Sequence, residues 1–208
     1  MITCYLLDGK TSSKGAAFKD FKTIEAVLKQ NQSLLWEIPA EAVVMLLDAW
    51  GKAIAKDKDI LKTEGAAYLS FYLKRNNVEN LINRSVGNLK FLDEFAASGR
   101  QPGKYLKAQG RGIVCHWIAG NVKTLAIYSL INSLLSRNSN ILRVPEENAA
   151  EVLEILYLLE DISIEYNGRS YNASGLTKNI ALVYFDSRDE LLNSGMSRIA
   201  DARVIWGG

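Results

Sequence analysis

Residues 112 to 145 constrain the fold more than any other stretch, because strand-like and helix-like apolar patterns alternate within them. The apolar run at 113–115 predicts a short strand, and Gly120 with Asn121 interrupts it before a helical pattern begins. Residues 141–142 predict a second buried strand, which ends before Pro145. A strand, a helix and a strand in this order almost always form a right-handed crossover, so we expect two parallel strands of one sheet.

Asn121 fits the N-cap of the connecting helix, because its side-chain oxygen can accept a hydrogen bond from the first turn. Ligands of parallel α/β sheets bind beyond the carboxyl ends of the strands. His116 and Trp117 lie at that end of the first predicted strand, and Arg143 at that end of the second. These residues are therefore the first candidates for a binding site.

The segment after Pro145 continues the α/β alternation. Residues 180–185 form a near-continuous apolar run, which is typical of a central parallel strand. We expect a helix at about 188–199 and a further strand at 203–206. Ser187 could bind a phosphate at the start of that helix, or Asp186 and Ser187 could simply cap it. The sequence leaves these two alternatives open.

The first hundred residues predict a different organisation. They contain a short strand at 2–7, expected as an edge strand or as a strand added to the sheet, then a polar loop near 10–15 and several helices. The expected helices lie at about 18–29, after Pro39, at 66–74 and at 78–95. Residues 98–103 are the best candidate for a linker. We therefore predict a mainly helical region at 1–100 and a Rossmann-like region at 101–208, and an Asn167-Gly168 hairpin within the latter.

The composition excludes several classes of protein. Apolar residues make up 48% of the chain and the net charge is +2, which does not suggest a nucleic-acid binder. We find no signal peptide and no apolar stretch long enough to span a membrane, and we expect a cytoplasmic protein. Cys4 and Cys115 lack the spacing of a disulfide framework or a zinc site, and a single histidine excludes a histidine-rich metal site.

Each polar residue of the predicted strands can have either a structural role in the core or a role in a binding or catalytic site. Cys115 and His116 point to opposite faces of a strand, so they do not form a nucleophile–base pair, and Cys115 is best read as a core residue. His116 could line a pocket or act as a base.

Arg143 needs an acceptor, which is either a glutamate of the next helix or the ribose or phosphate of a nucleotide. A glycine-rich dinucleotide fingerprint and a P-loop are both absent from the sequence.

Four segments together resemble the long-chain acyl-CoA reductase family of bacterial luminescence systems (LuxC-like), a branch of the aldehyde dehydrogenase superfamily. The segments are Val-Cys-His-Trp-Ile-Ala-Gly-Asn-Val at 114–122, Asn-Ser-Asn-Ile-Leu-Arg at 138–143, Ala-Leu-Val-Tyr-Phe at 181–185 and Ala-Asp-Ala-Arg-Val-Ile-Trp-Gly-Gly at 200–208. The resemblance is specific from about residue 110 onward and diffuse before that.

The resemblance implies reduction of a fatty acyl thioester to an aldehyde by NADPH, with NADH as the alternative, through a cysteine acyl-enzyme. The substrate would be a long-chain acyl-CoA or an acyl-protein thioester, and no nucleic acid or membrane span is implied. By position, Asn121 would be the oxyanion-hole asparagine, and Arg143 stands where the superfamily has a ribose-binding lysine. His116, Trp117 and Ile118 would line the nicotinamide, and Ser187 would lie near the pyrophosphate.

The family's nucleophilic cysteine lies in a domain beyond residue 208, so neither Cys4 nor Cys115 matches it. The resemblance therefore implies that this chain is the nucleotide-binding part of a longer enzyme and is inactive alone. A homo-oligomer is one assembly that the resemblance allows. The alternative is a non-catalytic homologue that acts as an interaction module through the strand at 203–206.

Overall fold

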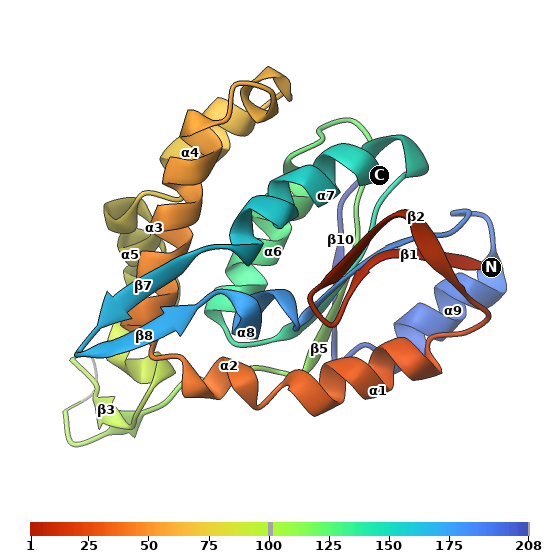
Figure 1. The fold of residues 1–208 in the computed structure, drawn as a ribbon. Coiled ribbons are helices and arrows are strands. Elements are labelled where there is room, and N and C mark those ends of the chain that lie inside the picture. The colour runs from red at the N-terminus through yellow and green to blue at the C-terminus, as the bar shows by residue number, and fades with distance from the viewer. Residues whose placement is uncertain (100–101, 208) are drawn as a thin grey trace.

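A six-stranded sheet with the order β10-β5-β6-β9-β1-β2 organises the computed structural model, which describes residues 1–99 and 102–207 (Figure 1). Four of its strands are mutually parallel: β5 (Ile113–Trp117), β6 (Ser139–Arg143), β9 (Ile180–Tyr184) and β10 (Ala202–Ile205). The predicted crossover at 112–145 is confirmed, and so is the central position of the strand at 180–185.

An N-terminal hairpin completes the sheet. β1 (Ile2–Leu7) pairs antiparallel with β9, and β2 (Lys10–Phe18) forms the outer edge. Residues 2–7 form a strand added to the sheet, as one of the two expected placements has it, and the other placement, at the sheet edge, is wrong. The loop expected near 10–15 is also wrong. Asp8 and Gly9 both have positive φ angles, 55° and 69°, and such a two-residue turn sends the chain straight back along β1. The β2 sequence looked like a loop because this edge strand is largely exposed and polar.

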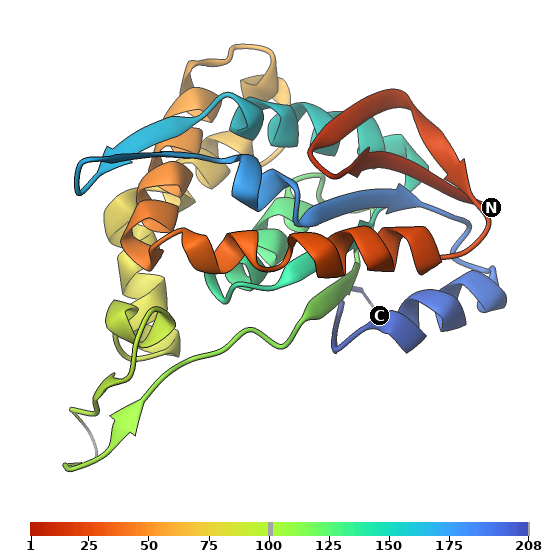
Figure 2. The same ribbon diagram turned by 60° about the horizontal axis from the view of Figure 1, so that its bottom comes forward.

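Helices cover both faces of the sheet. On one face lie α6 (Leu125–Leu135) and α7 (Glu146–Glu160), and on the other α1 (Lys22–Asn31) and α9 (Glu190–Ile199) (Figure 2). The prediction that Asn121 caps the helix is wrong, because α6 begins at Leu125 with Thr124 at the N-cap. The chain uses residues 119–124 to pass from the tip of β5 to the level of α6. Similarly, α1 begins after Phe18 because that residue pairs with Ile2 in the hairpin.

A second helical layer packs beyond α6 and α7. Its elements come mainly from the first hundred residues: α2 (Leu34–Glu37), α3 (Ala40–Lys56), η1 (Ile60–Lys62), α4 (Ala66–Tyr72), α5 (Arg75–Ser85), η2 (Leu89–Leu92) and, from later in the chain, α8 (Ser174–Thr177). Trp50 of α3 is fully buried and donates a 2.9 Å hydrogen bond to the carbonyl of Ile155 in α7. The helix expected at 78–95 stops at Ser85, because Gly87 has a φ of 99°.

One apolar cluster includes side chains from both sides of residue 100. The proposed linker at 98–103 contains Arg100 and Gln101, which lie outside the described residues. The division of the chain near residue 100 therefore stays a prediction.

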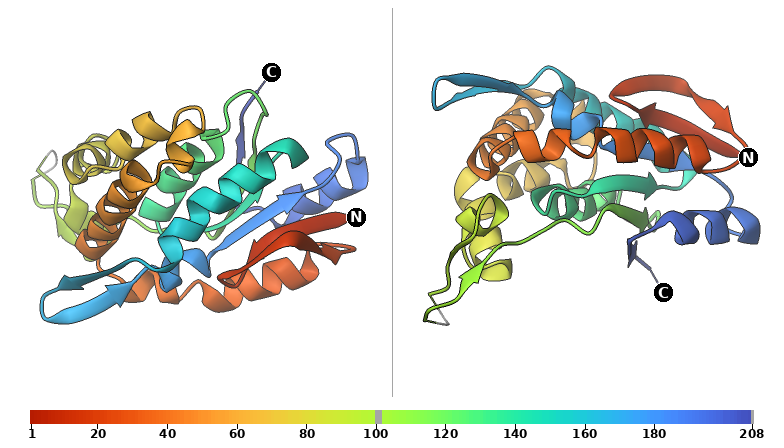
Figure 3. Two further views of the ribbon diagram at one scale, coloured as in Figure 1. Left: turned by 45° about the horizontal axis from the view of Figure 1, so that its top comes forward. Right: turned by 90° about the horizontal axis from the view of Figure 1, so that it is seen from below.

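Two short ribbons extend from this body. β7 (Ser163–Tyr166) and β8 (Arg169–Asn172) confirm the hairpin, with Asn167 and Gly168 at φ angles of 51° and 72°. β3 (Ala96–Ala97) and β4 (Tyr105–Leu106) form a narrow arm that points away from the sheet (Figure 3). Within the described ranges, no helix combines the length and apolar character that a bilayer crossing needs.

Candidate functional site

The carboxyl ends of β5, β6 and β9 bring three predicted site residues to one side of the sheet. Trp117 pairs in register with Arg143, and their side chains point to the face covered by α1 and α9. Ser187 follows β9 in the turn that leads into α9, on the same side. We call this cluster, Trp117, Arg143 and residues 186–189, the α9-side site.

Arg143 is the cation of the α9-side site. Its Nε and Nη2 donate to the carbonyl of Phe185 over 3.3 and 2.9 Å, and its guanidinium lies 5.5 Å from the centroid of the Phe185 ring. Only 9% of the residue is exposed, and this desolvation lowers the pKa of its guanidinium. The alternative of a salt bridge to a glutamate of the next helix is wrong, because no described carboxylate lies within ion-pair distance of it.

Asn193 of α9 connects the two other parts of the α9-side site. Its Oδ1 accepts a 2.9 Å hydrogen bond from the indole of Trp117, and its Nδ2 donates to the carbonyls of Ser187 and Asp189 over 2.8 and 3.0 Å. The amide thus joins the tip of β5 to the turn after β9, two segments that are far apart in the sequence.

The turn itself differs from what the sequence indicated. Asp189, not Asp186 or Ser187, caps α9, because its carboxylate accepts from the backbone N–H of Leu192 over 3.0 Å. The capping alternative for Asp186 and Ser187 is therefore wrong. Asp186 instead forms an exposed ion pair with Arg188, and Ser187 is exposed beside it. The Arg188 pairing lowers the pKa of the Asp186 carboxyl. Whether Ser187 contacts a phosphate stays a prediction.

His116 faces the opposite side of the sheet from Trp117. It is fully buried, with Nδ1 2.7 Å from the Ser129 hydroxyl and Nε2 3.1 Å from Oδ1 of Asn140. Because the Asn140 oxygen can only accept, Nε2 carries the proton and Nδ1 accepts from Ser129. Burial lowers the pKa of His116 to about 4, so the ring is neutral at physiological pH. Both ring nitrogens are thus occupied within the fold.

Cys115 points away from His116, toward α9. The side chain is fully buried, its Sγ lies 3.5 Å from the carbonyl of Met196, and desolvation raises the pKa of its thiol to about 12. The interpretation of Cys115 as a core residue is confirmed, and a thiol–imidazole pair with His116 is excluded by the geometry.

A hollow of about 520 Å³ lies beside His116, on the α6 side of β10. Ser129 and Val204 line it, and so does Trp206, whose indole donates a 3.0 Å hydrogen bond to Ser129. The sequence analysis did not identify Ser129 or Asn140. An asparagine directly before the buried Ile141-Leu142 pair was the available signal for Asn140, because a buried amide needs a partner.

Ile118 and Asn121 belong to the loop between β5 and α6. The backbone N–H of Ile118, a buried residue, donates to the carbonyl of Arg143 over 3.0 Å, while Asn121 is exposed. Asn148 of α7 donates to the carbonyl of Gly120 over 3.2 Å. Lys123 also forms an ion pair with Glu151 of α7. The loop that carries Asn121 is therefore fastened to α7.

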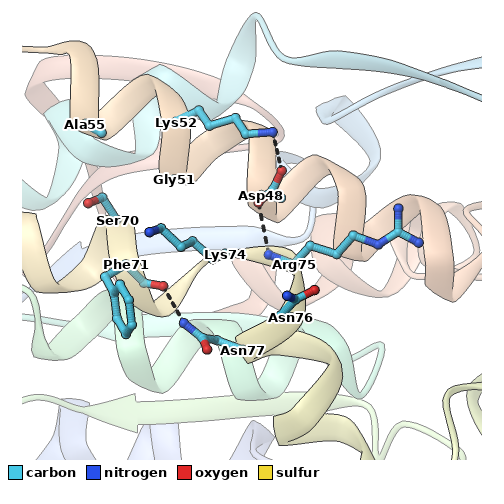
Figure 4. Close-up of a pocket in the computed structure, with 10 residues that line it drawn as sticks. All are labelled: Asp48, Gly51, Lys52, Ala55, Ser70, Phe71, Lys74, Arg75, Asn76 and Asn77. Atoms are coloured by element: carbon cyan, nitrogen blue, oxygen red, sulfur yellow. Dashed lines mark hydrogen bonds and ion pairs between the residues drawn. The ribbon is translucent and has the colours of Figure 1, made fainter.

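A further hollow, of about 490 Å³, lies between α3 and the corner of α4 and α5 (Figure 4). Lys74 lies over the Phe71 ring, 4.8 Å from its centroid, and Asp48 pairs with Lys52 over 2.6 Å. The residues that line this hollow include none of the predicted site residues.

Sequence comparisons place these observations among known proteins. The family model for acyl-CoA reductases (LuxC) matches residues 37–208. A long-chain acyl-protein thioester reductase of Aliivibrio fischeri is 23% identical over 130 residues, which cover 62% of this chain and 25% of that protein. Long-chain acyl-protein thioester reductase 2 of Photobacterium leiognathi is 21% identical over 159 residues, which cover 76% and 31%. The chain thus spans between a quarter and a third of these relatives' length.

Solved structures of dehydrogenases share this fold. A 3,6-anhydro-L-galactose dehydrogenase superposes with a TM-score of 0.61 at 15% identity, covering 99% of this chain and 43% of that one. The NADP complex of glyceraldehyde-3-phosphate dehydrogenase from Bacillus halodurans gives a TM-score of 0.60 at 12% identity, covering 99% and 44%. The predicted α/β fold of the aldehyde dehydrogenase type is confirmed.

Proposed function

The chain belongs to the acyl-CoA reductase (LuxC) family, and from this premise we propose that it is the nucleotide-binding part of a long-chain acyl thioester reductase. The reaction reduces a fatty acyl thioester, carried by CoA or by a protein, to a fatty aldehyde and a free thiol. NADPH supplies the hydride, and the acyl group passes through a cysteine thioester on a part of the enzyme outside this chain. The names of the relatives support an acyl thioester as the substrate.

The α9-side site has the chemistry that a nicotinamide dinucleotide requires. A dinucleotide carries negative phosphates and ribose hydroxyls, and Arg143 offers a guanidinium that has no carboxylate partner among the described residues. Trp117 is half-buried and presents an aromatic surface beside it. β6 and β9 follow β5 on one side of it in the sheet, whereas β10 lies on the other side of β5. Ligands of such sheets bind where the strand order reverses in this way. In our proposal Arg143 binds the ribose or phosphate, Ser187 binds the pyrophosphate, and Trp117 and Ile118 border the nicotinamide. His116 would border it through its backbone, because its side chain faces the opposite side of the sheet.

Asn121 has a separate role in the proposal. Its side-chain amide is exposed on the loop after β5, and it would donate a hydrogen bond to the oxygen that becomes negatively charged during attack on the thioester. One such donor lowers a barrier by about 3–4 kcal/mol. The contacts of Asn148 and Glu151 with this loop support the role, because a donor works only when its position is fixed.

The observation that carries the proposal is the guanidinium of Arg143, which is largely buried at the strand tips and, among the described residues, hydrogen-bonds to the Phe185 carbonyl and to no carboxylate. We expect titration calorimetry to detect NADPH binding to the chain. Arg143→Ala should weaken binding by at least tenfold, because a charged hydrogen bond contributes about 1.5–3 kcal/mol. Arg143→Lys keeps the charge without the planar fork and should fall between the two.

Arg198→Ala is the matched control, because it removes an exposed arginine from the far end of α9. It should leave the affinity for NADPH unchanged. Absence of binding at millimolar NADPH, or equal losses in Arg143→Ala and Arg198→Ala, would contradict the proposal. The same titration with NADH decides between the two cofactors.

A second candidate function, a non-catalytic interaction module, is favoured by one observation. Within the described residues β10 pairs only with β5, and Ile205 and Trp206 beside this free edge are 71% and 43% exposed. An open strand edge of this kind can pair with another chain. Sedimentation analysis tests it: a dimer that Ile205→Lys dissociates, in a chain that binds no NADPH, would favour the module over the reductase.

A cytoplasmic location and assembly into a homo-oligomer complete the proposal. Cys4 and Cys115 are both free and buried, which suits a reducing compartment. The same sedimentation experiment measures the oligomeric state.

A further inference from the structure

Asn193 makes more contacts at the α9-side site than its place on a half-exposed helix would suggest. Its one amide group accepts from the Trp117 indole and donates to two carbonyls, those of Ser187 and Asp189. All three distances lie between 2.8 and 3.0 Å, which is the usual range for strong hydrogen bonds. Both ends of the amide are therefore used, and they serve different segments of the chain.

The other restraints on the 186–189 turn come from elsewhere. Arg143 binds the Phe185 carbonyl just before the turn, and the Asp186–Arg188 pair lies within it and is exposed. An exposed ion pair between near neighbours fixes little, because solvent screens it. Of the residues that the structure describes, Asn193 is thus the one whose side chain ties the turn to the tip of β5 by hydrogen bonds.

We infer that Asn193 is a positioning residue for the cofactor site: its amide holds the Trp117 indole and the Ser187 turn in one fixed arrangement, so that both can contact the same dinucleotide. The inference rests on the proposed function. Without the amide, each segment could still fold, but binding would have to order the two relative to each other, and this ordering reduces affinity.

Two substitutions separate the halves of the amide. Asn193→Asp keeps an oxygen that accepts from the Trp117 indole but removes the donor to the Ser187 and Asp189 carbonyls. Asn193→Leu removes both at similar volume. Asn193→Leu adds no charge and should weaken NADPH binding by about tenfold in calorimetry. Asn193→Asp should weaken it at least as much, because its carboxylate also repels the two carbonyl oxygens and the phosphates of the ligand. Ser194→Ala, on the next and exposed residue of α9, is the matched control and should bind like the parent chain.

Coupling to Trp117 distinguishes positioning from a general loss of stability. Trp117→Phe keeps an aromatic ring but cannot donate to Asn193. If Asn193 acts through the indole, the double variant Trp117→Phe with Asn193→Leu should lose less affinity than the sum of the two single losses. All affinities are measured at a temperature well below the thermal unfolding midpoint of each variant. If Asn193 had a merely structural role, its substitution would lower this midpoint temperature and leave the affinity for NADPH unchanged.

The outcomes are distinguishable. A parent chain that binds NADPH, with both Asn193 variants within twofold of it, overturns this inference and leaves the proposed function standing. Strictly additive losses in the double variant also overturn it. A parent chain that binds no NADPH overturns the proposed function and this inference together.

Discussion

His116 and Trp117 are neighbours in β5, yet they lie in two different environments. We call the His116 side the closed face, because the imidazole is fully buried and bonded to Ser129 and Asn140, although a hollow of about 520 Å³ lies beside it. We call the Trp117 side the open face, because the indole is half-buried beside an exposed turn and beside a guanidinium that pairs with no carboxylate in the described part of the chain. One face of the strand tip thus stabilises the fold, while the other keeps polar groups available to a ligand. The difference shows that proximity in sequence does not assign a common role.

Removal of the His116 ring should produce the largest effect. His116→Ala leaves a cavity in the closed face and removes the acceptor of the Ser129 hydroxyl and the donor to Oδ1 of Asn140. We expect the free energy of unfolding to fall by about 3 kcal/mol. Urea denaturation measures it. A loss as small as that of a surface substitution would show that the closed face is not a stabilising network.

The pH dependence of stability tests the same face without a cavity. The pKa of His116 falls from 6.5 to about 4 on folding, so the unfolded chain binds a proton in this window and the folded chain does not. Stability is therefore fully present above pH 6.5 and is lost as the pH falls. The histidine should contribute a loss of about 3 kcal/mol between pH 7 and pH 4.

This chain offers a clean control, because it contains a single histidine. His116→Gln removes the titration, so the difference between the two urea–pH profiles isolates the histidine from the carboxylates. Parallel profiles would contradict a depressed pKa for this group.

On the open face, Trp117→Phe should cost less than any change to His116. The ring is retained and only the hydrogen bond to Asn193 disappears, so we expect a loss of about 1 kcal/mol. The urea midpoint of this variant is compared directly with that of His116→Ala. Equal losses at the two positions would abolish the contrast between the faces.

The exposed ion pair at the edge of the open face should matter least to stability. Asp186→Asn removes the partner of Arg188, whose side chain is 89% exposed, and solvent already screens this pair. We expect no measurable change in the thermal midpoint. A clear shift would mean that the 186–189 turn is more tightly coupled to the sheet than its contacts indicate.

The sequence alone predicted the features that depend on local pattern. Apolar spacing predicted the crossover at 112–145, and Asn167-Gly168 predicted the β7–β8 hairpin, because few residues adopt the required backbone. The family was recognised from four segments rather than from a single motif. Alternation along β5 also predicted that Cys115 and His116 lie on opposite faces.

What the sequence could not provide depends on distant partners. Nothing in the sequence of residues 10–18 indicates that they form β2 and pair with β1. A polar edge strand of this kind has the same sequence pattern as a loop. The contact of Arg143 with the Phe185 carbonyl, and that of Trp117 with Asn193, join residues separated by 42 and 76 positions. Which face of β5 is open follows from those contacts and not from any pattern within the strand.

The β1–β2 hairpin has a consequence for how this sheet can be extended. β2 carries Lys10 and Lys14 along the outer flank, and its pairing with β1 is irregular between Cys4 and Leu6. Charged side chains and irregular pairing discourage any further strand on that flank. A further strand can therefore join the described sheet at its β10 edge more readily than at its β2 edge. The β10 edge lies next to β5, whose tip carries the open face.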